Sequence, residues 1–281
     1  MQQTNDLKPK KRGRLRLLAG KTYYTAMRYM LWHSGRFKFA KKVSNKQLPH
    51  SFFAHQSPLL RRLRDVDMWY QYNKIANLKI AVPNINGLML YPGETFSYWK
   101  TIGNPTRRKG YVEGMVLLSG RFGPGIGGGL CQLSNLLYWI SLHTPLTVVE
   151  RYRHGYDVFP DSSRTRPFGS GATCFYPYRD LMVQNNTRQP FQLCAEVGET
   201  FLKAEWRCQQ KPQLHYEVFE KDHVMKPEYW GGFSRHNKLY RWVVNDCNEV
   251  LQEEFVAENH AMMMYSPFLQ QPNKPVEDTK K

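Results

Sequence analysis

Apolar residues recur at helical spacing in three stretches of the chain. In residues 15–40 and 61–80, large apolar side chains return every three or four positions, which predicts two amphipathic helical regions. The most regular pattern leads from a run of glycines to His143, and Pro145 stops it. It predicts a helix whose apolar face is formed by Leu130, Leu133, Leu136, Leu137 and Ile140.

Shorter apolar runs between turn residues predict strands. They occupy residues 88–91, 95–99, 111–118, 146–150, 173–176, 181–183 and 191–197. Helices and strands do not alternate regularly, as they would around a doubly wound parallel sheet. The pattern therefore predicts an α+β fold. A mainly antiparallel sheet would pack against the helix that bears Cys131, and N-terminal helices would cover the other face or reach toward a membrane.

The same patterns divide the chain into five parts. Residues 1–14 form a polar, basic arm and residues 270–281 a polar tail, and we predict that both are disordered. Between them we predict a helical and loop region at 15–60, a central domain at 61–210 and an aromatic-rich C-terminal extension at 211–269.

The composition indicates a folded protein with a large excess of positive charge. Hydrophobic residues make up 41% of the chain, and seven Trp, 17 Tyr and 15 Phe are enough to fill a sizeable core. The formal net charge of +17 favours anionic partners, such as an acidic membrane surface or a phosphorylated substrate. No recognisable nucleic-acid-binding module accompanies this charge, so we expect no nucleic acid partner.

The cysteine count and the apolar runs bear on the compartment. Five Cys with no CxxC spacing disfavour both a disulfide framework and a four-Cys zinc site. Reduced thiols are typical of cytosolic proteins. We also expect neither a metal nor a cofactor. No apolar run has a signal peptide's pattern or the roughly 18 residues of a membrane span. We therefore predict a cytoplasmic protein.

The first helical region, residues 15–40, has two interpretations. Its basic face favours attachment to the inner membrane surface or to a lipid-linked anion. In the second interpretation the helix packs on its own domain and leaves its basic face in solvent. We expect the second, because glycines and hydroxyl residues interrupt the apolar face.

The densest chemical signal is the glycine-rich run from Gly123 to Gln132, which contains Gly127, Gly128 and Gly129. Clustered glycines permit positive φ angles and close approach of another group. Because the run opens onto a helix, free N–H groups and the positive helix end would face the turn. A cysteine in the first helical turn, such as Cys131, gains a lowered thiol pKa, and the N–H groups could stabilise an oxyanion.

A cysteine nucleophile also needs a base. His154 follows the next predicted strand and could activate Cys131, while Asp157 or Asp161 could orient its imidazole. In the alternative interpretation, Cys131 is a small residue that packs the turn and His154 is a loop histidine.

A group of side chains near the glycines could bind the substrate. Arg151, Arg153 and Gln132, with the N–H groups of residues 127–129, could hold a phosphate or carboxylate of a cell-wall precursor. The alternative is that the arginines belong to a solubilising basic surface.

Two further sites are compatible with the same residues. Gly123, Gly125 and Gly128 match the dinucleotide-binding fingerprint, with Glu150 at the position of the ribose-binding acid. Against it, the preceding strand does not run directly into the first glycine. Cys131, His154 and Cys174 could instead bind one metal ion, although their spacing matches no short ligand motif.

Several motifs together resemble those of the VanW family, most strongly over residues 75–197. In chain order they are Gly93-Glu94-Thr95-Phe96-Ser97, Gly110-Tyr111, the run from Gly127 to Asn135, Val149-Glu150-Arg151 with His154, and Asp180-Leu181 with Asn185-Asn186-Thr187.

The resemblance implies a role near glycopeptide resistance or cell-envelope metabolism, and it implies no particular reaction. Members of the family often have an Asp before the Ala-Thr pair that corresponds to Ala172 and Thr173, where this chain has Gly171. A third catalytic group would therefore have to be another residue, such as Asp157 or Asp161.

These observations lead to two hypotheses of function. The first is a cysteine-dependent acyltransferase or hydrolase that acts on a peptidoglycan precursor, with Cys131 as nucleophile and His154 as base. The second is a non-catalytic module that binds an anionic cell-wall intermediate. Thiol reactivity at neutral pH distinguishes them, because only the enzyme needs one fast-reacting cysteine.

Overall fold

The computed structural model describes residues 13–61, 67–118, 121–158 and 166–267. Its helices are α1 (Arg14–His33), α2 (Trp69–Ala81), α3 (Tyr98–Ile102) and α4 (Cys131–Leu142), with 3-10 turns at Val82–Asn84 and Arg107–Lys109. Its strands are β1 (Lys38–Phe39), β2 (His50–Pro58), β3 (Leu88–Leu90), β4 (Glu94–Ser97), β5 (Glu113–Leu118), β6 (Arg121–Ile126), β7 (Thr147–Glu150), β8 (Tyr156–Asp157), β9 (Met182–Gln184), β10 (Phe191–Val197), β11 (Phe201–Cys208), β12 (Leu214–Pro227), β13 (Phe233–Asn245) and β14 (Val250–Met263).

The strands form three four-stranded sheets and one hairpin. The sheet orders are β1-β4-β9-β7, β2-β11-β10-β3 and β12-β13-β14-β8, and β5 pairs with β6. Among the described strands, only the pairs β1–β4 and β14–β8 are parallel. The predicted α+β fold with mainly antiparallel sheets is confirmed.

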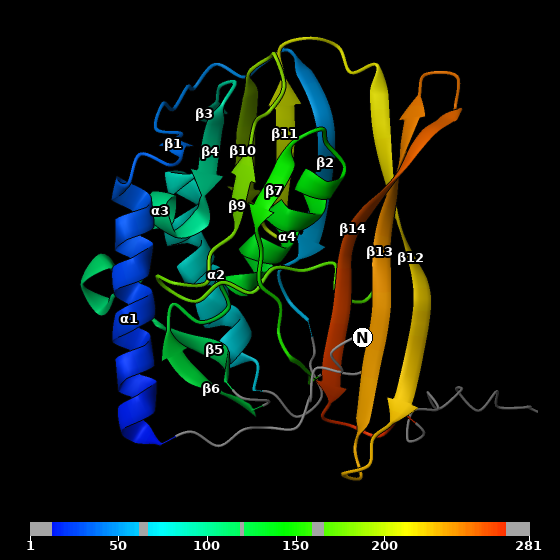
Figure 1. Ribbon diagram of the computed structural model, residues 1–281. Coiled ribbons are helices and arrows are strands. Elements are labelled where there is room, and N and C mark those ends of the chain that lie inside the picture. Colours follow the sequence, from blue (N-terminus) through cyan, green and yellow to red (C-terminus); the bar gives the residue numbers. More distant parts are fainter. Residues whose placement is uncertain (1–12, 62–66, 119–120, 159–165, 268–281) are drawn as a thin grey trace, which may run out of the picture.

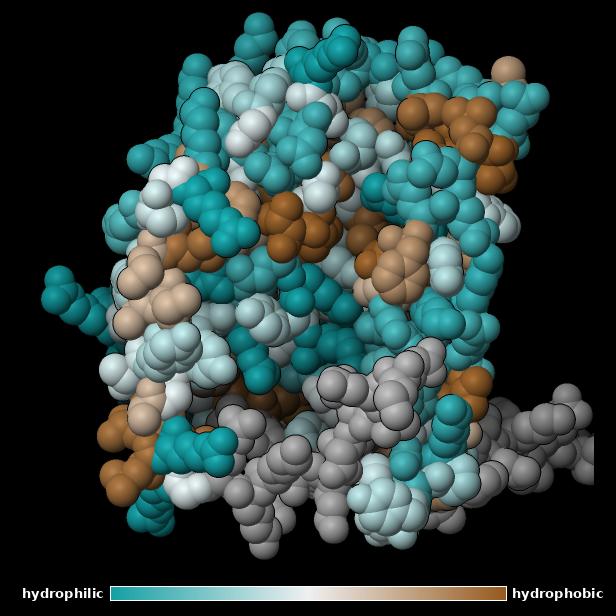
Figure 2. All heavy atoms as spheres, viewed as in Figure 1, coloured by the Kyte–Doolittle hydropathy of each residue, from teal (hydrophilic) through white to brown (hydrophobic). Residues whose placement is uncertain are grey.

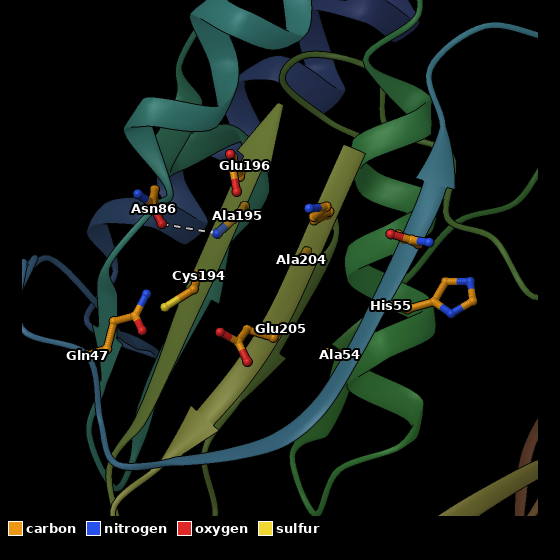
Figure 3. A pocket seen from close by; sticks show the side chains of 11 residues that line it. Gln47, Ala54, His55, Asn86, Cys194, Ala195, Glu196, Ala204 and Glu205 are labelled. Atoms are coloured by element: carbon orange, nitrogen blue, oxygen red, sulfur yellow. Dashed lines mark hydrogen bonds between the residues drawn. The ribbon is translucent and has the colours of Figure 1, made fainter. Parts of the chain in front are cut away.

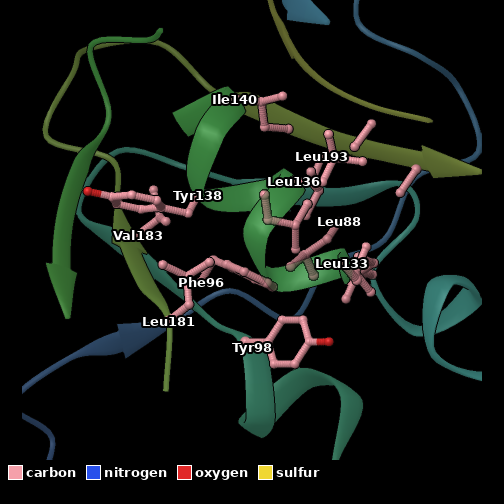
Figure 4. Close-up of a cluster of buried hydrophobic side chains, with 14 of the residues drawn as sticks. Leu88, Phe96, Tyr98, Leu133, Leu136, Tyr138, Ile140, Leu181, Val183 and Leu193 are labelled. Carbon is pink, nitrogen blue, oxygen red and sulfur yellow. The ribbon is translucent and has the colours of Figure 1, made fainter. Parts of the chain in front are cut away.

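Helix α4 is the centre of the hydrophobic core. Its apolar repeat buries Leu133, Leu136 and Ile140 completely, as the sequence pattern predicts. These side chains pack in one cluster with Phe96 of β4 and Leu193 of β10 (Figure 4). The helix contacts β2, β11 and β7, so it joins two of the sheets.

The C-terminal region forms a long three-stranded antiparallel ribbon, β12 to β14, which stands along one side of the molecule (Figure 1). The ribbon is joined to the core by β8, which pairs with the end of β14. Arg241 of β13 adds a second connection, because its guanidinium donates to the carbonyls of Leu142 and Thr144 after α4. The expected extension at 211–269 is therefore packed on the domain that carries Cys131.

Helix α1 lies along the opposite edge of the molecule and is fixed through one face only (Figure 1). Arg28 and Trp32 are buried against the body, whereas Leu15 is 84% exposed. The expectation that the apolar face of this helix packs on its own domain is therefore wrong over most of α1. Among the helices described, none is long and apolar enough to cross a membrane.

Three local predictions differ from the structure. Within the segment 41–60, expected as loop, residues 50–58 form β2, an edge strand that pairs with β11. The predicted strand at 173–176 is a turn closed by a bridge between Phe175 and Arg179. The predicted helix at 61–80 is observed from Trp69, and its residues 62–66 lie outside the described residues.

The dinucleotide-binding interpretation of the glycines is wrong. Gly123 and Gly125 lie inside β6, where they pair with Val116 and Gly114 of β5. The fingerprint requires a parallel strand, then a glycine loop, then a helix. Here the glycines belong to an antiparallel hairpin, so the phosphate-binding geometry of that motif does not form.

Candidate functional site

The glycine turn between β6 and α4 is packed tightly against its neighbours. A side chain at Gly128 would overlap the backbone of Gly114, and one at Gly129 would overlap the aliphatic chain of Lys74. Gly127 and Gly129 also have positive φ angles of 72° and 87°. The glycines are therefore required by backbone conformation and close packing.

The N–H groups of this turn are bound within the chain. Those of Gly127 and Gly129 donate to the carbonyls of Val112 and Met115 at 3.0 and 2.9 Å. The N–H of Gly128 donates to Gly125, and that of Gln132 donates back to Gly129. These four donors are thus committed inside the fold, and none of them forms an anion-binding hole.

Cys131 opens α4 and is half-buried. Burial raises the pKa of its thiol, although the backbone N–H groups of Cys174 and Cys131 act in the opposite direction. The structure therefore differs from the expectation that the helix start lowers this pKa. Desolvation of the thiolate outweighs the helix end, because the charged form loses its water.

The segment around residue 172 is bound to α4 by two motif residues. Ser134 donates to the carbonyl of Ala172 at 2.7 Å, and the side-chain oxygen of Asn135 accepts from its N–H at 2.8 Å. A side chain at Gly171 would overlap that same Asn135 amide. In this chain Asn135 therefore occupies the space in which a carboxylate at position 171 would lie.

Two of the predicted substrate-binding side chains hold parts of the fold together. The amide of Gln132 donates to the Ser57 hydroxyl at 3.0 Å and to the Pro58 carbonyl at 2.9 Å, which fixes α4 to β2. Arg151 donates to the carbonyls of Gly171 and Gly169 and to Asn259 of β14. Its guanidinium also lies over the Tyr138 ring, 4.8 Å from the centroid.

The predicted base, His154, lies in a positively charged environment. Burial, with the charges of Arg179 and Arg153, lowers the pKa of His154 to about 4. Burial and the nearby charge of Arg151 also lower the pKa of Arg153, to about 10. At neutral pH His154 is therefore uncharged and a weak base.

We call Arg153, His154 and Arg179 the arginine–histidine cluster. Arg153 donates to the carbonyl of His154 at 3.2 Å, and the Arg179 guanidinium lies 6.0 Å from the centroid of the Tyr152 ring. In contrast to Arg28 and Arg235, which face carboxylates, neither Arg153 nor Arg179 has a carboxylate partner among the residues described. Within the described ranges, the positive charge of the cluster is therefore not neutralised by a carboxylate.

Asp157 and Asp161 are the predicted orienting carboxylates. Asp157 is buried and accepts from Arg235 at 3.4 Å and from Tyr265 at 2.8 Å, so its carboxylate is engaged with the C-terminal region. Within the described parts of the chain, no hydrogen bond joins it to His154. Asp161 lies outside the described residues.

Sequence reasoning missed a buried polar network behind the site. Asp180 is fully buried and accepts from the Ser97 hydroxyl at 2.5 Å and from the Trp99 N–H at 2.9 Å. Arg28 of α1 forms a bidentate ion pair with Glu150, and its guanidinium lies 4.0 Å from the Asp180 carboxylate. Burial raises the pKa of Asp180 to about 7. Ser97, Glu150 and Asp180 all lie in the motifs noted above, whereas nothing in the sequence marks Arg28.

The described residues form no metal site, and one pocket lies away from Cys131. Across the described ranges, no three His, Cys, Asp or Glu side chains are placed to hold a metal ion, so the Cys131–His154–Cys174 site does not form. A pocket of about 560 Å³ lies on the sheet face that points away from α4, beside Cys194 and Glu205 (Figure 3). None of the predicted site residues lines it.

The chain is similar to two curated proteins and to one family. Residues 73–207 match a family described as VanW like protein. The Vancomycin B-type resistance protein VanW of Enterococcus faecalis is 34% identical over 228 residues, which cover 81% of this chain and 82% of that protein. The Uncharacterized protein YoaR of Bacillus subtilis is 31% identical over 123 residues, 43% of this chain and 38% of that protein. No solved structure matches the chain.

Proposed function

The chain belongs to the VanW family, and on that premise we propose that it is an accessory protein of vancomycin-type glycopeptide resistance and cell-wall metabolism. Its relative from Enterococcus faecalis carries that resistance in its name and aligns with most of both chains. We further propose that this protein acts by binding an anionic cell-wall intermediate. Its five free cysteines favour a cytoplasmic place of action.

The observation that supports binding is the positive charge of the arginine–histidine cluster, which no carboxylate among the described residues neutralises. Arg153 is partly buried without a carboxylate partner among the described residues, and the second cation, Arg179, acts on the same imidazole. A buried cation is stabilised when it meets an anion, and guanidinium groups match phosphate and carboxylate oxygens in two-point contacts. A phosphate or carboxylate group of a peptidoglycan precursor would supply the missing negative charge.

The neutral state of His154 fits a binding role. With its pKa lowered to about 4, the imidazole can donate one N–H to a bound anion without being protonated first. The same state makes it a poor partner for a cysteine nucleophile, because a base with so low a pKa holds a proton weakly.

A second candidate function is the cysteine-dependent acyltransferase or hydrolase. The observation that favours it is the place of Cys131 at the start of α4, where backbone N–H groups act to lower the pKa of its thiol. His154 would then act as the base, with no carboxylate among the described residues hydrogen-bonded to it. The enzyme requires a thiolate at neutral pH, whereas the binding module does not.

A cellular complementation experiment tests the proposed function. In a vancomycin-resistant strain that lacks its own VanW protein, the wild-type chain should restore the resistance level that the deletion removes. The Arg153→Ala/Arg179→Ala variant should fail, while Cys131→Ala should restore resistance fully. Arg188→Ala is the matched control, because Arg188 is an exposed arginine after β9. Failure of the wild-type chain would contradict the resistance role, and failure of Cys131→Ala alone would favour the enzyme.

A further inference from the structure

The solvent-facing side of α1 carries a continuous line of apolar side chains. Leu15 is 84% exposed, Tyr23 59% and Met30 64%. With the residues between them at helical spacing they lie on one face of the helix. We call this face the outer stripe: Leu15, Ala19, Tyr23, Ala26, Met27 and Met30, all exposed. Figure 2 shows apolar side chains down the left edge of the molecule, over α1.

The opposite side of α1 holds the helix in a fixed orientation. Arg28 pairs with Glu150 and donates to the Tyr178 carbonyl at 3.0 Å. Trp32 is buried beside Tyr176, with ring centroids 6.3 Å apart. Because these contacts fix the rotation of the helix, the outer stripe cannot turn inward while they are intact. An apolar helix face held in solvent in this way marks a surface that another apolar phase covers.

The charge of α1 indicates which kind of surface covers it. The helix contains no Asp or Glu, and Arg14, Arg16 and Lys21 are exposed in its first half. Two copies of α1 packed together would bring only cations near one another, and such like-charge contacts are unfavourable. An anionic lipid surface supplies both an apolar layer and negative phosphates. Tyrosine is also enriched where the two layers meet.

We propose that α1 lies flat on an anionic lipid bilayer, with the outer stripe in the boundary between headgroups and acyl chains. Arg16, which lies beside the stripe, would reach the lipid phosphates, because its long side chain can extend past the apolar residues. Arg14 and Lys21 add to the positive charge that attracts the helix to the anionic surface. The arrangement anchors the protein peripherally and keeps the rest of the fold on the aqueous side. It makes no use of the arginine–histidine cluster.

Co-sedimentation of the full-length protein with vesicles tests this proposal. The vesicles are phosphatidylcholine alone, or phosphatidylcholine mixed with phosphatidylglycerol. The test variant is Leu15→Glu/Tyr23→Glu/Met30→Glu. The matched control is Tyr229→Glu/Val250→Glu/Leu251→Glu, which makes the same charge change at exposed apolar residues of the C-terminal ribbon. Thermal unfolding verifies that both variants are folded.

We expect the wild-type protein to bind the vesicles that contain phosphatidylglycerol and to be released by salt, which screens the charge attraction. The stripe variant should bind at least about ten-fold more weakly, and the control variant should bind like the wild type. A second variant, Arg14→Gln/Arg16→Gln/Lys21→Gln, should weaken binding only to the anionic vesicles.

Three results would overturn the proposal. One is a wild-type protein that does not bind anionic vesicles. Another is a stripe variant that binds as well as the wild type. The third is a wild-type dimer in sedimentation equilibrium that the stripe variant converts to a monomer, because the stripe would then be covered by a second copy of the chain.

Discussion

Arg28 and Glu150, which are 122 residues apart, form a bidentate ion pair between α1 and β7. The Arg28 side chain is buried, with 5% exposed, and that of Glu150 is partly buried, with 18% exposed. Glu150 also accepts from the Asp180 N–H at 3.3 Å. The N-terminal helix is thereby fixed to residues that lie in the family motifs.

Removal of one partner from this pair should destabilise the protein strongly. In Glu150→Gln the buried Arg28 guanidinium loses the carboxylate that neutralises it, so we expect a loss of about 3 kcal/mol in the free energy of unfolding. Denaturant titration measures the change. Glu253→Gln is the control, because its pair with Lys221 is exposed to solvent and should contribute far less to stability. Equal losses in the two variants would contradict this structure of the pair.

A glycine of the turn, Gly128, can be compared with a glycine of the preceding strand, Gly123. Gly128→Ala would drive a methyl group into the backbone of Gly114, so we expect a loss of at least about 3 kcal/mol, or failure to fold. Gly123→Ala adds its methyl group to open space and should change stability by no more than about 0.5 kcal/mol. Thermal unfolding checks both variants. A tolerated Gly128→Ala would show that the turn is not packed in this way.

Thiol labelling separates the binding module from the enzyme. Because burial raises the pKa of Cys131, iodoacetamide at neutral pH should label it at least about ten-fold more slowly than the exposed Cys247. Peptide mass mapping gives the rate at each cysteine. Fast, selective labelling of Cys131 that disappears in His154→Ala would instead support catalysis.

The buried histidines predict a loss of stability in mild acid. His143 and His154 have folded pKa values of about 4, below the ordinary 6.5. The unfolded chain therefore takes up protons first as the pH falls. The contribution of the two uncharged histidines to the stability of the fold is complete above about pH 6.5. It is lost as the pH falls toward 4.

The measurement is the thermal midpoint between pH 7 and pH 5, which should fall as the solution becomes more acidic. His143→Gln should be less stable at neutral pH, since it loses the ring stacking on Phe53, and its midpoint should depend less on pH. His33→Gln, at an exposed histidine, should keep the wild-type dependence. A pH dependence that is unchanged in His143→Gln would contradict the assignment.

The sequence predicted the parts of the fold that have a strong local pattern. The repeat from Leu130 to Ile140 predicted α4, and the short apolar runs between turn residues predicted β5, β9 and β10. It did not predict β2, because this edge strand has polar residues such as Ser51 and Gln56 where one face meets solvent. The long ribbon was also missed, since polar residues such as Asn237 and Asn259 are buried there by hydrogen bonds between strands.

The sequence predicted which residues surround Cys131, but not what their hydrogen bonds hold together. The glycines, Gln132 and Arg151 were predicted to bind a substrate, and the hydrogen bonds that the structure gives them lie within the chain. Sequence cannot distinguish a donor that is aimed at a ligand from one that holds a neighbouring loop. Arg179 was not selected, because its relation to His154 depends on how distant segments fold together.

Isothermal titration calorimetry tests the binding role most directly. The purified protein is titrated with a uridine diphosphate-linked muramoyl peptide. Arg188→Ala and Cys131→Ala serve as controls. We expect saturable binding that weakens by at least about ten-fold in Arg153→Ala and in Arg179→Ala, because each variant loses a charge-assisted hydrogen bond. Both control variants should bind like the wild type. Wild-type binding that survives both arginine substitutions, or no binding of this precursor or of inorganic pyrophosphate, would contradict an anion site at the arginine–histidine cluster.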